Sequence, residues 1–297
     1  MKAKIKQLLK KRNAIMLAHN YQPPEIQDLA DLCGDSLELS IKASKTDAEV
    51  ILFCGVHFMA ETASILSPEK TVLLPRKDAG CPMADMITPE ALQQMLDKLP
   101  PIPVVTYVNS PASVKALTTI CCTSANVIQV VNSLDSDIVL MAPDRNLAQY
   151  TAANTSKNIH IWNGYCPIHD RLTPQDVMAA KSAHPEATFM AHPECRLDVL
   201  ELADVIVSTS GMIRHASESN NNTFIVGTEV GLLHPLKRAN PGKTFYPASE
   251  KMICDDMKKI TLEDVVRTLE NMEGEVNVPE DIRVKAFKAV DRMVSLA

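Results

Sequence analysis

Three cysteines recur in one local sequence pattern and could together bind a metal. Cys81, Cys166 and Cys254 each stand seven residues before a threonine that opens an amphipathic run, and they lie 85 and 88 residues apart. Thiolates are ligands that zinc and iron–sulfur clusters both accept. Because the pattern occurs in three copies at nearly constant spacing, we expect these thiols to converge on one metal centre.

The spacing of these cysteines leaves the kind of metal centre open. A structural zinc site needs a fourth protein ligand, which His169, three residues after Cys166, could supply. A [4Fe–4S] cluster held by three cysteines would instead leave one iron open for a substrate. The remaining cysteines have no repeated setting and are interpreted as small buried hydrophobic residues. They are Cys33, Cys54, Cys121, Cys122 and Cys195.

A second pattern places polar side chains at the ends of three predicted strands, within residues 13–22, 102–111 and 187–196. The corresponding residues are His19, Tyr107 and His192. A hydroxyl residue stands seventeen positions beyond each of them, and these are Ser36, Ser124 and Thr209. Such residues commonly cap helices, but hydroxyls at strand–helix junctions can also bind an anion. Together they could hold a dicarboxylate.

The positions two residues beyond the strand-end residues differ among the copies. In chain order they hold Tyr21, Asn109 and Glu194. Glu194 is the only acid among them, and it is therefore the candidate general base.

Both patterns belong to a repeated unit of about 85 residues. Each copy reads as four apolar strands that alternate with helices, which predicts a parallel sheet with helices on both faces. The predicted fold class is α/β, with three homologous α/β/α domains over residues 1–84, 85–170 and 171–260. The helical stretches in residues 261–297 are expected to pack back on the first domain and close a ring.

The repeat also predicts where the active site lies. Ligands in open α/β sheets bind beyond the carboxyl ends of the strands. All the candidate residues follow strands, so a pseudo-threefold ring with these edges turned inward brings them together at its centre.

The composition argues against several other classes of protein. The 297-residue chain has a net charge of −6, which disfavours nucleic-acid binding, and no apolar run approaches the ~20 residues of a membrane span. The basic N-terminal segment lacks the apolar core of a signal peptide. CxxC, GxGxxG and P-loop motifs are absent. These features favour a cytoplasmic protein.

These residues and their surroundings resemble the quinolinate synthase family (quinolinate synthase A). The similarity runs through HNYQ near residue 19, GDSLELS, CGVHFMAETA, LLPRKDAGCPMADM, TYVNS, CTSAN, HPEC, GTEVG, NPGKTFYP and CDDMKKITL near residue 260. The resemblance implies three α/β domains around a pseudo-threefold axis. It also implies a transferase that condenses iminoaspartate (iminosuccinate) with dihydroxyacetone phosphate to give quinolinate, phosphate and water, a step of NAD biosynthesis.

The resemblance further implies a cofactor, an oxygen-sensitive [4Fe–4S] cluster with one open iron. Its ligands correspond to Cys81, Cys166 and Cys254. Some members carry extra cysteines around the last ligand, but Cys254 stands alone, which argues against a thiol/disulfide switch there. Functional coupling to an L-aspartate oxidase or an aspartate dehydrogenase is also suggested.

Roles for individual residues follow from the same resemblance. The family's catalytic tyrosine corresponds to Tyr21, and Tyr107 and Glu194 are further catalytic candidates. The substrate-binding positions correspond to His19, Ser36, Tyr107, Val108, Asn109, Ser124, His192, Pro193, Glu194 and Thr209.

Two interpretations from other classes also fit the residues. One is a non-catalytic zinc- or cluster-binding protein that senses a dicarboxylate. The other is an aconitase-like dehydratase that uses an open iron on a different acid.

Overall fold

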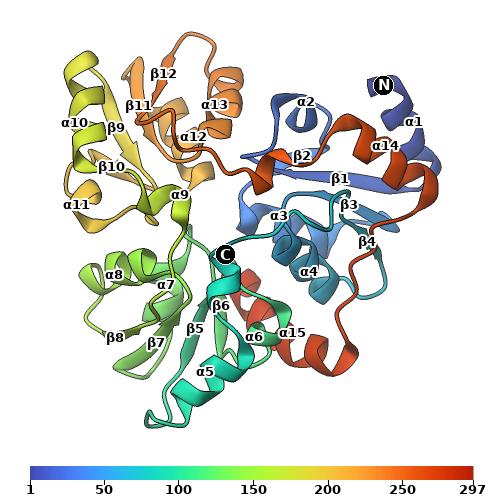
Figure 1. Ribbon diagram of the computed structural model, residues 1–297, viewed down its shortest axis with the longest axis horizontal. Helices are drawn as coiled ribbons and strands as arrows, with labels where there is room; N and C mark the ends of the chain where they lie inside the picture. Colours follow the sequence, from blue (N-terminus) through green and yellow to red (C-terminus); the bar gives the residue numbers. More distant parts are fainter. Residues whose placement is uncertain (297) are drawn as a thin grey trace.

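Each predicted repeat forms a four-stranded parallel sheet in the computed structural model, which describes residues 1–296 (Figure 1). The first sheet contains β1 (Ala14–His19), β2 (Leu32–Gly34), β3 (Val50–Cys54) and β4 (Thr71–Leu73). The second contains β5 (Val104–Tyr107), β6 (Ile120–Cys122), β7 (Ile138–Ala142) and β8 (Asn158–Ile161). The third contains β9 (Thr188–Ala191), β10 (Val205–Ile206), β11 (Thr223–Gly227) and β12 (Thr244–Pro247). The predicted fold class is confirmed.

Helices alternate with these strands. Around the first sheet lie α1 (Lys2–Lys11), α2 (Pro24–Gln27), α3 (Ser36–Lys45) and α4 (His57–Leu66). The second unit has η1 (Ala84–Met86), α5 (Pro89–Leu96), α6 (Ala112–Lys115), α7 (Val127–Asn132) and α8 (Arg145–Ala153). The second unit ends with α9 (Pro167–Asp170), and the third has α10 (Pro174–Ala183), α11 (Leu197–Leu200), α12 (Thr209–Glu218), η2 (Val230–Leu232), α13 (Leu233–Ala239) and η3 (Asp256–Lys258). The chain ends with α14 (Leu262–Asn271) and α15 (Glu280–Ser295).

The strand order is the same in each sheet. The first strand pairs in parallel with the second on one side and the third on the other, and the fourth pairs with the third, as in β2-β1-β3-β4. The winding direction therefore reverses between the first and third strands. Ligands bind at such switch points, beyond the carboxyl ends of the strands. His19, at the end of β1, lies at the first of these points.

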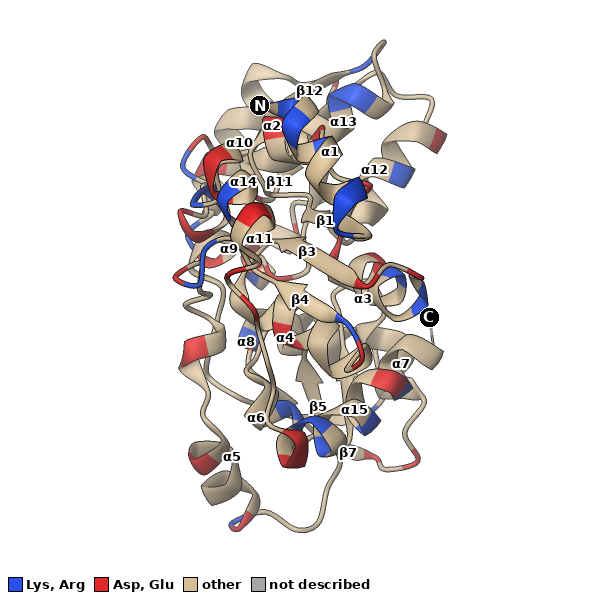
Figure 2. Ribbon diagram, turned by 90° about the vertical axis from the view of Figure 1, so that its right-hand side faces the viewer, with Lys and Arg blue, Asp and Glu red and all other residues tan. Residues whose placement is uncertain are grey.

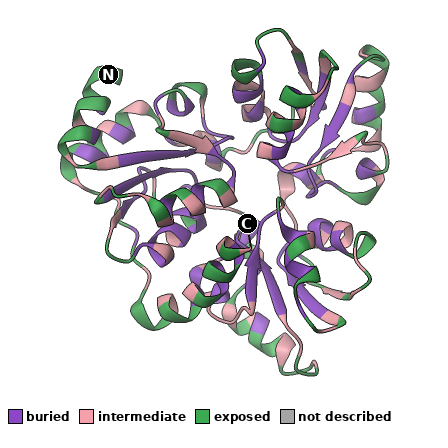
Figure 3. Cartoon of the chain, turned by 180° about the vertical axis from the view of Figure 1, so that it is seen from behind, coloured by how far each residue is buried: buried purple, intermediate pink, exposed green. Residues whose placement is uncertain are grey.

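The central strands are apolar because helices cover both faces of a parallel sheet. All five residues of β3, from Val50 to Cys54, are buried. Cys121, Cys122 and Cys195 are fully buried as well, in agreement with their interpretation as core residues, whereas Cys33 is partly exposed. Charged residues lie mainly on the helices and loops of the periphery (Figure 2). The buried strands converge toward the centre (Figure 3).

The threonines that follow the repeated cysteines begin helices, as predicted. Thr88, Thr173 and Thr261 are the N-caps of α5, α10 and α14, and each hydroxyl accepts a backbone N–H of the first turn. Asp176 and Asp264 complete capping boxes at the second and third of these helices. Each cysteine therefore lies on the connection from a fourth strand to the next capped helix.

The two C-terminal helices contact different units. α14 packs against α1, where the Arg12 guanidinium donates to the carbonyls of Leu269 at 3.0 Å and Glu270 at 2.7 Å. α15 packs against α4 of the first unit and against α6 and β6 of the second. The sequence predicts that the C-terminal helices pack on the first domain. The structure shows that α15 also contacts the second unit. Among the described residues, no helix is both long and apolar enough to cross a membrane.

The position of α15 predicts that its buried face holds two units together. Met293 is fully buried on this helix, whereas Val284 is 44% exposed. We expect Met293→Ala to lower the free energy of unfolding by about 2–5 kcal/mol, because it removes buried apolar contacts and leaves a cavity. Val284→Ala should change it by less than about 0.5 kcal/mol. Denaturant unfolding measures both, and equal effects would contradict the assigned packing.

Candidate active site at the centre of the three units

The carboxyl ends of the sheets surround one cavity at the centre of the molecule (Figure 1). Residues from all the repeated positions line it, and so do the predicted residues that follow them. These residues are His19, Tyr21, Ser36, Cys81, Tyr107, Asn109, Ser124, Cys166, His192, Glu194, Thr209 and Cys254. Val108 and Pro193 are not among its lining residues. Val108 is buried, and Pro193 borders a separate hollow with Ser124.

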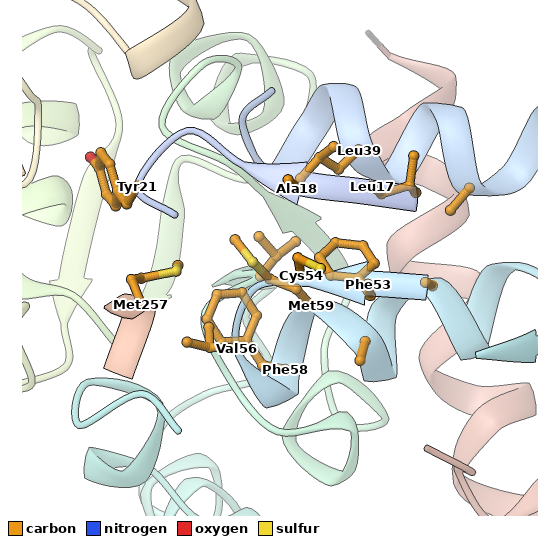
Figure 4. Close-up of a cluster of buried hydrophobic side chains, with 14 of the residues drawn as sticks. Leu17, Ala18, Tyr21, Leu39, Phe53, Cys54, Val56, Phe58, Met59 and Met257 are labelled. Carbon is orange, nitrogen blue, oxygen red and sulfur yellow. The ribbon is translucent and has the colours of Figure 1, made fainter. Parts of the chain in front are cut away.

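Apolar side chains form part of the cavity wall. Val56, Phe58, Met59 and Met257 line it, and Figure 4 shows Met257 near Tyr21, apart from the group around Phe58. Each of these apolar residues is less than a tenth exposed. An apolar wall limits water and lowers the local dielectric constant, which strengthens the polar interactions inside.

Backbone N–H groups orient the two strand-end imidazoles. The N–H of Tyr21 donates to Nδ1 of His19, and the N–H of Glu194 donates to Nδ1 of His192, each at 3.2 Å. Burial lowers the pKa of both imidazoles to about 3. Each ring is therefore neutral and carries its proton on Nε2. Two neutral N–H donors are thus available to a ligand in the cavity.

The repeated hydroxyls do not cap helices in this structure. Asp35 caps α3, and its carboxylate accepts the N–H groups of Leu37 and Glu38. Ser208 caps α12 by accepting the N–H of Gly211 at 3.2 Å. Ser36 and Thr209 follow these caps as the first residues of the two helices and line the cavity. The capping interpretation of these two hydroxyls is wrong. The Thr209 hydroxyl accepts the Asn20 amide at 3.1 Å and keeps its own proton for a ligand.

Glu194, in the third unit, is held by partners from the second unit. Its Oε1 accepts the Tyr107 hydroxyl at 2.5 Å, and its Oε2 lies 2.6 Å from Nδ1 of His169. Its backbone carbonyl accepts the Asn146 amide at 3.0 Å. Burial alone would raise the pKa of Glu194, but the His169 imidazole and the Tyr107 hydroxyl outweigh it and lower the pKa. Glu194 is therefore a carboxylate.

A continuous chain of hydrogen bonds connects Glu194 to Tyr21. Nε2 of His169 lies 2.8 Å from the Thr228 hydroxyl, which lies 2.5 Å from the Tyr21 hydroxyl. One proton on each group satisfies these three contacts, and Nδ1 of His169 also lies 3.2 Å from Sγ of Cys166. Tyr21 donates to Thr228, Thr228 donates to His169, and Nδ1–H of His169 donates to Glu194. Burial, with the charge of Glu194, raises the pKa of Tyr21, so the phenol keeps its proton.

Two acidic side chains hold the loops of the second and third cysteines. Oδ2 of Asp144 accepts the N–H of Cys166 at 3.0 Å, and Oε1 of Glu229 accepts the N–H of Cys254 at 3.2 Å. Each acid stands two residues beyond the third strand of its sheet. In the first unit the same position is Val56, which cannot accept a hydrogen bond. Neither acid was predicted from the sequence as a site residue, although both occupy the same position of the repeat.

The cysteines fit a cluster better than a single ion. Burial raises the pKa of Cys81 to about 12 and that of Cys254 to about 11, so three thiolates here need the positive charge of a metal centre. A zinc ion with bonds of about 2.3 Å holds tetrahedral sulfurs about 3.8 Å apart. Among the described residues, the three-donor set within 4.8 Å is Cys166, His169 and Glu194, and the three cysteines do not meet that spacing.

The fold and the cavity define a class of protein, a three-unit α/β protein with a cavity where its sheets converge. The model of the family described as Quinolinate synthetase A protein matches residues 3–295. The chain is 56% identical to "Quinolinate synthase" of Geobacter sp. (strain M21), with 100% of this chain and 97% of the relative covered. It is 54% identical to "Quinolinate synthase 1" of Methanosarcina acetivorans, with 99% and 96% covered.

The chain belongs to the quinolinate synthase A family. The family expected from the sequence motifs is thereby confirmed, and so is an enzyme of NAD biosynthesis. Full-length similarity to quinolinate synthases excludes the sensor and the aconitase-like dehydratase as descriptions of the chain. Members of this family bind a [4Fe–4S] cluster.

Ser36 lines the cavity whereas Ser208 caps α12, so substitutions of these two serines should affect ligand binding and stability differently. Ser36→Ala should weaken binding of the dicarboxylate succinate about tenfold, because a bond to a charged carboxylate is lost, and change unfolding by less than about 0.5 kcal/mol. Ser208→Ala should cost about 1 kcal/mol of stability and leave succinate affinity unchanged. Calorimetric titration and thermal unfolding measure both properties. The reverse result would return Ser36 to a capping role.

Proposed function

We propose that the central cavity is the site at which this chain acts as a quinolinate synthase, condensing iminoaspartate with dihydroxyacetone phosphate. The products are quinolinate, phosphate and water. The observation that carries the proposal is the convergence of three repeat-related cysteines on the cavity that also holds His19 and His192. The three α/β units, 1–84, 85–170 and 171–260, with the helices of 261–297, form the scaffold.

The proposed ligands of a [4Fe–4S] cluster are Cys81, Cys166 and Cys254. The observations in support are that all three cysteines line the cavity, that their sulfurs do not all lie within 4.8 Å of one another, and that burial raises the pKa of the thiols, so that thiolates there need a compensating charge. When bound, such a cluster supplies an open iron that acts as a Lewis acid on a hydroxyl or carboxylate, without net redox change.

The substrate's carboxylates are proposed to bind the neutral donors of the cavity. His19 and His192 offer Nε2–H groups, and Ser36, Ser124 and Thr209 offer hydroxyls. Neutral donors suit a buried dicarboxylate because the protein need not bury free cations to bind it. Asn109 completes the set, and its Oδ1 is buried without a hydrogen-bond partner. That oxygen could accept the N–H of an imine or amine. Val108 and Pro193 are also proposed as substrate-binding positions, by their place next to Asn109 and Glu194 in the chain.

Proton transfers are proposed to run along the hydrogen-bond chain from Tyr21 to Glu194. The Glu194 carboxylate accepts a proton, and Tyr107, at 2.5 Å, stabilises the carboxylate between transfers. When the His169 imidazole carries its own proton on Nε2, a proton taken by Glu194 can pass to Nδ1 of His169 over 2.6 Å while Nε2–H donates to Thr228 over 2.8 Å. Tyr21, at the far end, can donate to a leaving group and be reprotonated from within the chain. Phosphate loss, ring closure and dehydration all require such transfers.

Two further proposals concern the surroundings of the enzyme. Iminoaspartate would be supplied by an enzyme that oxidises aspartate, either an L-aspartate oxidase or an aspartate dehydrogenase. We also propose a cytoplasmic location, which agrees with the acidic composition and the apparent need for free thiols.

One experiment tests the function and the metal together. The protein is purified without oxygen, and iron, sulfide and zinc are measured per chain. Turnover of iminoaspartate with dihydroxyacetone phosphate is then followed as quinolinate formation. About four irons and four sulfides per chain with turnover is the expected result. Stoichiometric zinc without iron, or a full cluster without quinolinate, would contradict the proposal.

The ligand assignment predicts which cysteines the cluster needs. Cys81→Ala, Cys166→Ala and Cys254→Ala should each lose the iron and the activity, because two thiolates do not retain a four-iron cluster. Cys54→Ala and Cys195→Ala are the buried controls and should keep both. The vicinal pair Cys121–Cys122 precedes Ser124. Cluster loss in either of these with retention in Cys254→Ala would overturn the assignment.

The proton-transfer chain predicts selective losses of turnover. Glu194→Gln and Tyr21→Phe should each lower kcat about 10²-fold or more while iron and sulfide per chain stay at the wild-type level. Glutamine keeps the shape of the side chain but cannot take the proton. Steady-state kinetics with metal analysis on the same samples measures this. Wild-type kcat in either variant would remove that residue from proton transfer.

A further inference from the structure

Lys258 and Glu229 form an ion pair beside the loops that carry Tyr21 and Cys254. Nζ of Lys258, in η3, lies 2.9 Å from Oε1 and 3.0 Å from Oε2 of Glu229. The same Nζ donates to the backbone carbonyl of Tyr21. Glu229 is fully buried, and its carboxylate also accepts the N–H groups of Cys254 and Gly231. The pair therefore connects the first unit to the third.

The corresponding acid of the second unit has no lysine partner, which allows the two units to be compared. Asp144 is the counterpart of Glu229 and holds the N–H of Cys166 in the same way. In the described part of the chain, no lysine or arginine side chain forms an ion pair with Asp144, and the guanidinium of the adjacent Arg145 pairs with Asp170 instead. The counterpart of Lys258, four residues after Cys166, is Asp170. An acidic side chain thus holds a cysteine loop without a lysine, and the contact of Lys258 with the Tyr21 carbonyl has no counterpart in the second unit.

Tyr21 is restrained at both ends by adjacent residues of the third unit. Its hydroxyl bonds the Thr228 hydroxyl at 2.5 Å, and its carbonyl reaches Glu229 through Lys258. Two neutral contacts support the same loop. The Gln22 amide donates to the carbonyl of Met257 at 2.8 Å, and the Gln27 amide donates to that of Gly231 at 3.2 Å. Of these contacts, the one to Tyr21 itself is made by a charged group, the ammonium of Lys258.

We propose that Lys258 is a positioning residue that holds the Tyr21 hydroxyl in register with the hydrogen-bond chain to Glu194. It acts through the Tyr21 carbonyl and the buried Glu229 carboxylate, and it does not line the cavity. The inference rests on the proposed role of Tyr21 in proton transfer. Displacement of a reacting group by about 1 Å lowers rates by orders of magnitude, so loss of this contact acts on turnover.

The test compares Lys258→Met with Lys258→Arg in the wild-type and Tyr21→Phe backgrounds. Lys258→Met should lower kcat about tenfold or more, with KM for iminoaspartate within about twofold and full iron content. Lys258→Arg should recover most of the loss, since a guanidinium can bridge the same oxygens. In the Tyr21→Phe background, Lys258→Met should cause less than about a twofold further loss, because both changes disable one element.

Lys259→Met is the matched control. Nζ of Lys259 contacts Asp256 and the carbonyl of Asp78 and has no contact with Tyr21 or Glu229. Its kcat should equal that of the wild type. Thermal unfolding of each variant reports any general structural damage.

A spectroscopic measurement follows Tyr21 without turnover. The chain has five tyrosines, so 3-fluorotyrosine labelling gives few ¹⁹F resonances, and Tyr21→Phe identifies the one from Tyr21. Lys258→Met should shift or broaden that resonance, and Lys258→Arg should restore it. An equal loss of kcat in both backgrounds, or an unmoved resonance, would overturn the proposal. Wild-type kcat in Tyr21→Phe alone would instead reject the proposed role of Tyr21.

Discussion

The carboxylate of Glu194 is buried where the units meet. The energetic cost of burying its charge is the strongest constraint on how the units pack. Glu194 is 3% exposed, and an isolated charge in such a place would be costly. Its partners come from elsewhere in the fold, Tyr107 from the second sheet and His169 from the connection that follows that sheet. The units must therefore dock correctly before the charge is compensated. The same contacts create the path along which protons are proposed to move.

The molecule combines a repeated scaffold with an unrepeated site. Each unit supplies the same positions, namely a strand-end residue, a helix-start position and a cysteine loop, because the strand order is the same in all three sheets. The chemistry at those positions differs. The third strand is followed two residues later by Val56, Asp144 or Glu229, and the lysine that contacts Tyr21 occurs only in the last copy. Because the residues at equivalent positions differ, the cavity combines side chains with different chemical roles.

Much of this arrangement could be predicted from the sequence, because the informative residues recur at fixed offsets. The offsets placed His19, Ser36 and Cys81 at strand ends, and the rule for parallel sheets brought them to one edge. The tertiary contacts could not be predicted in the same way. Thr228 joins the hydrogen-bond chain only because α9 brings His169 beside it, fifty-nine residues away in sequence. The contact of α15 with the second unit likewise depends on packing that an amphipathic pattern does not specify.

The central claim is that one cysteine from each unit holds a single four-iron cluster in the cavity. A crystal structure of the protein purified without oxygen, with anomalous diffraction collected at the iron absorption edge, tests it most directly. The expected result is one compact iron peak bonded to the sulfurs of Cys81, Cys166 and Cys254. A single metal ion bound by Cys166, His169 and Glu194, with Cys81 and Cys254 unligated, would contradict it.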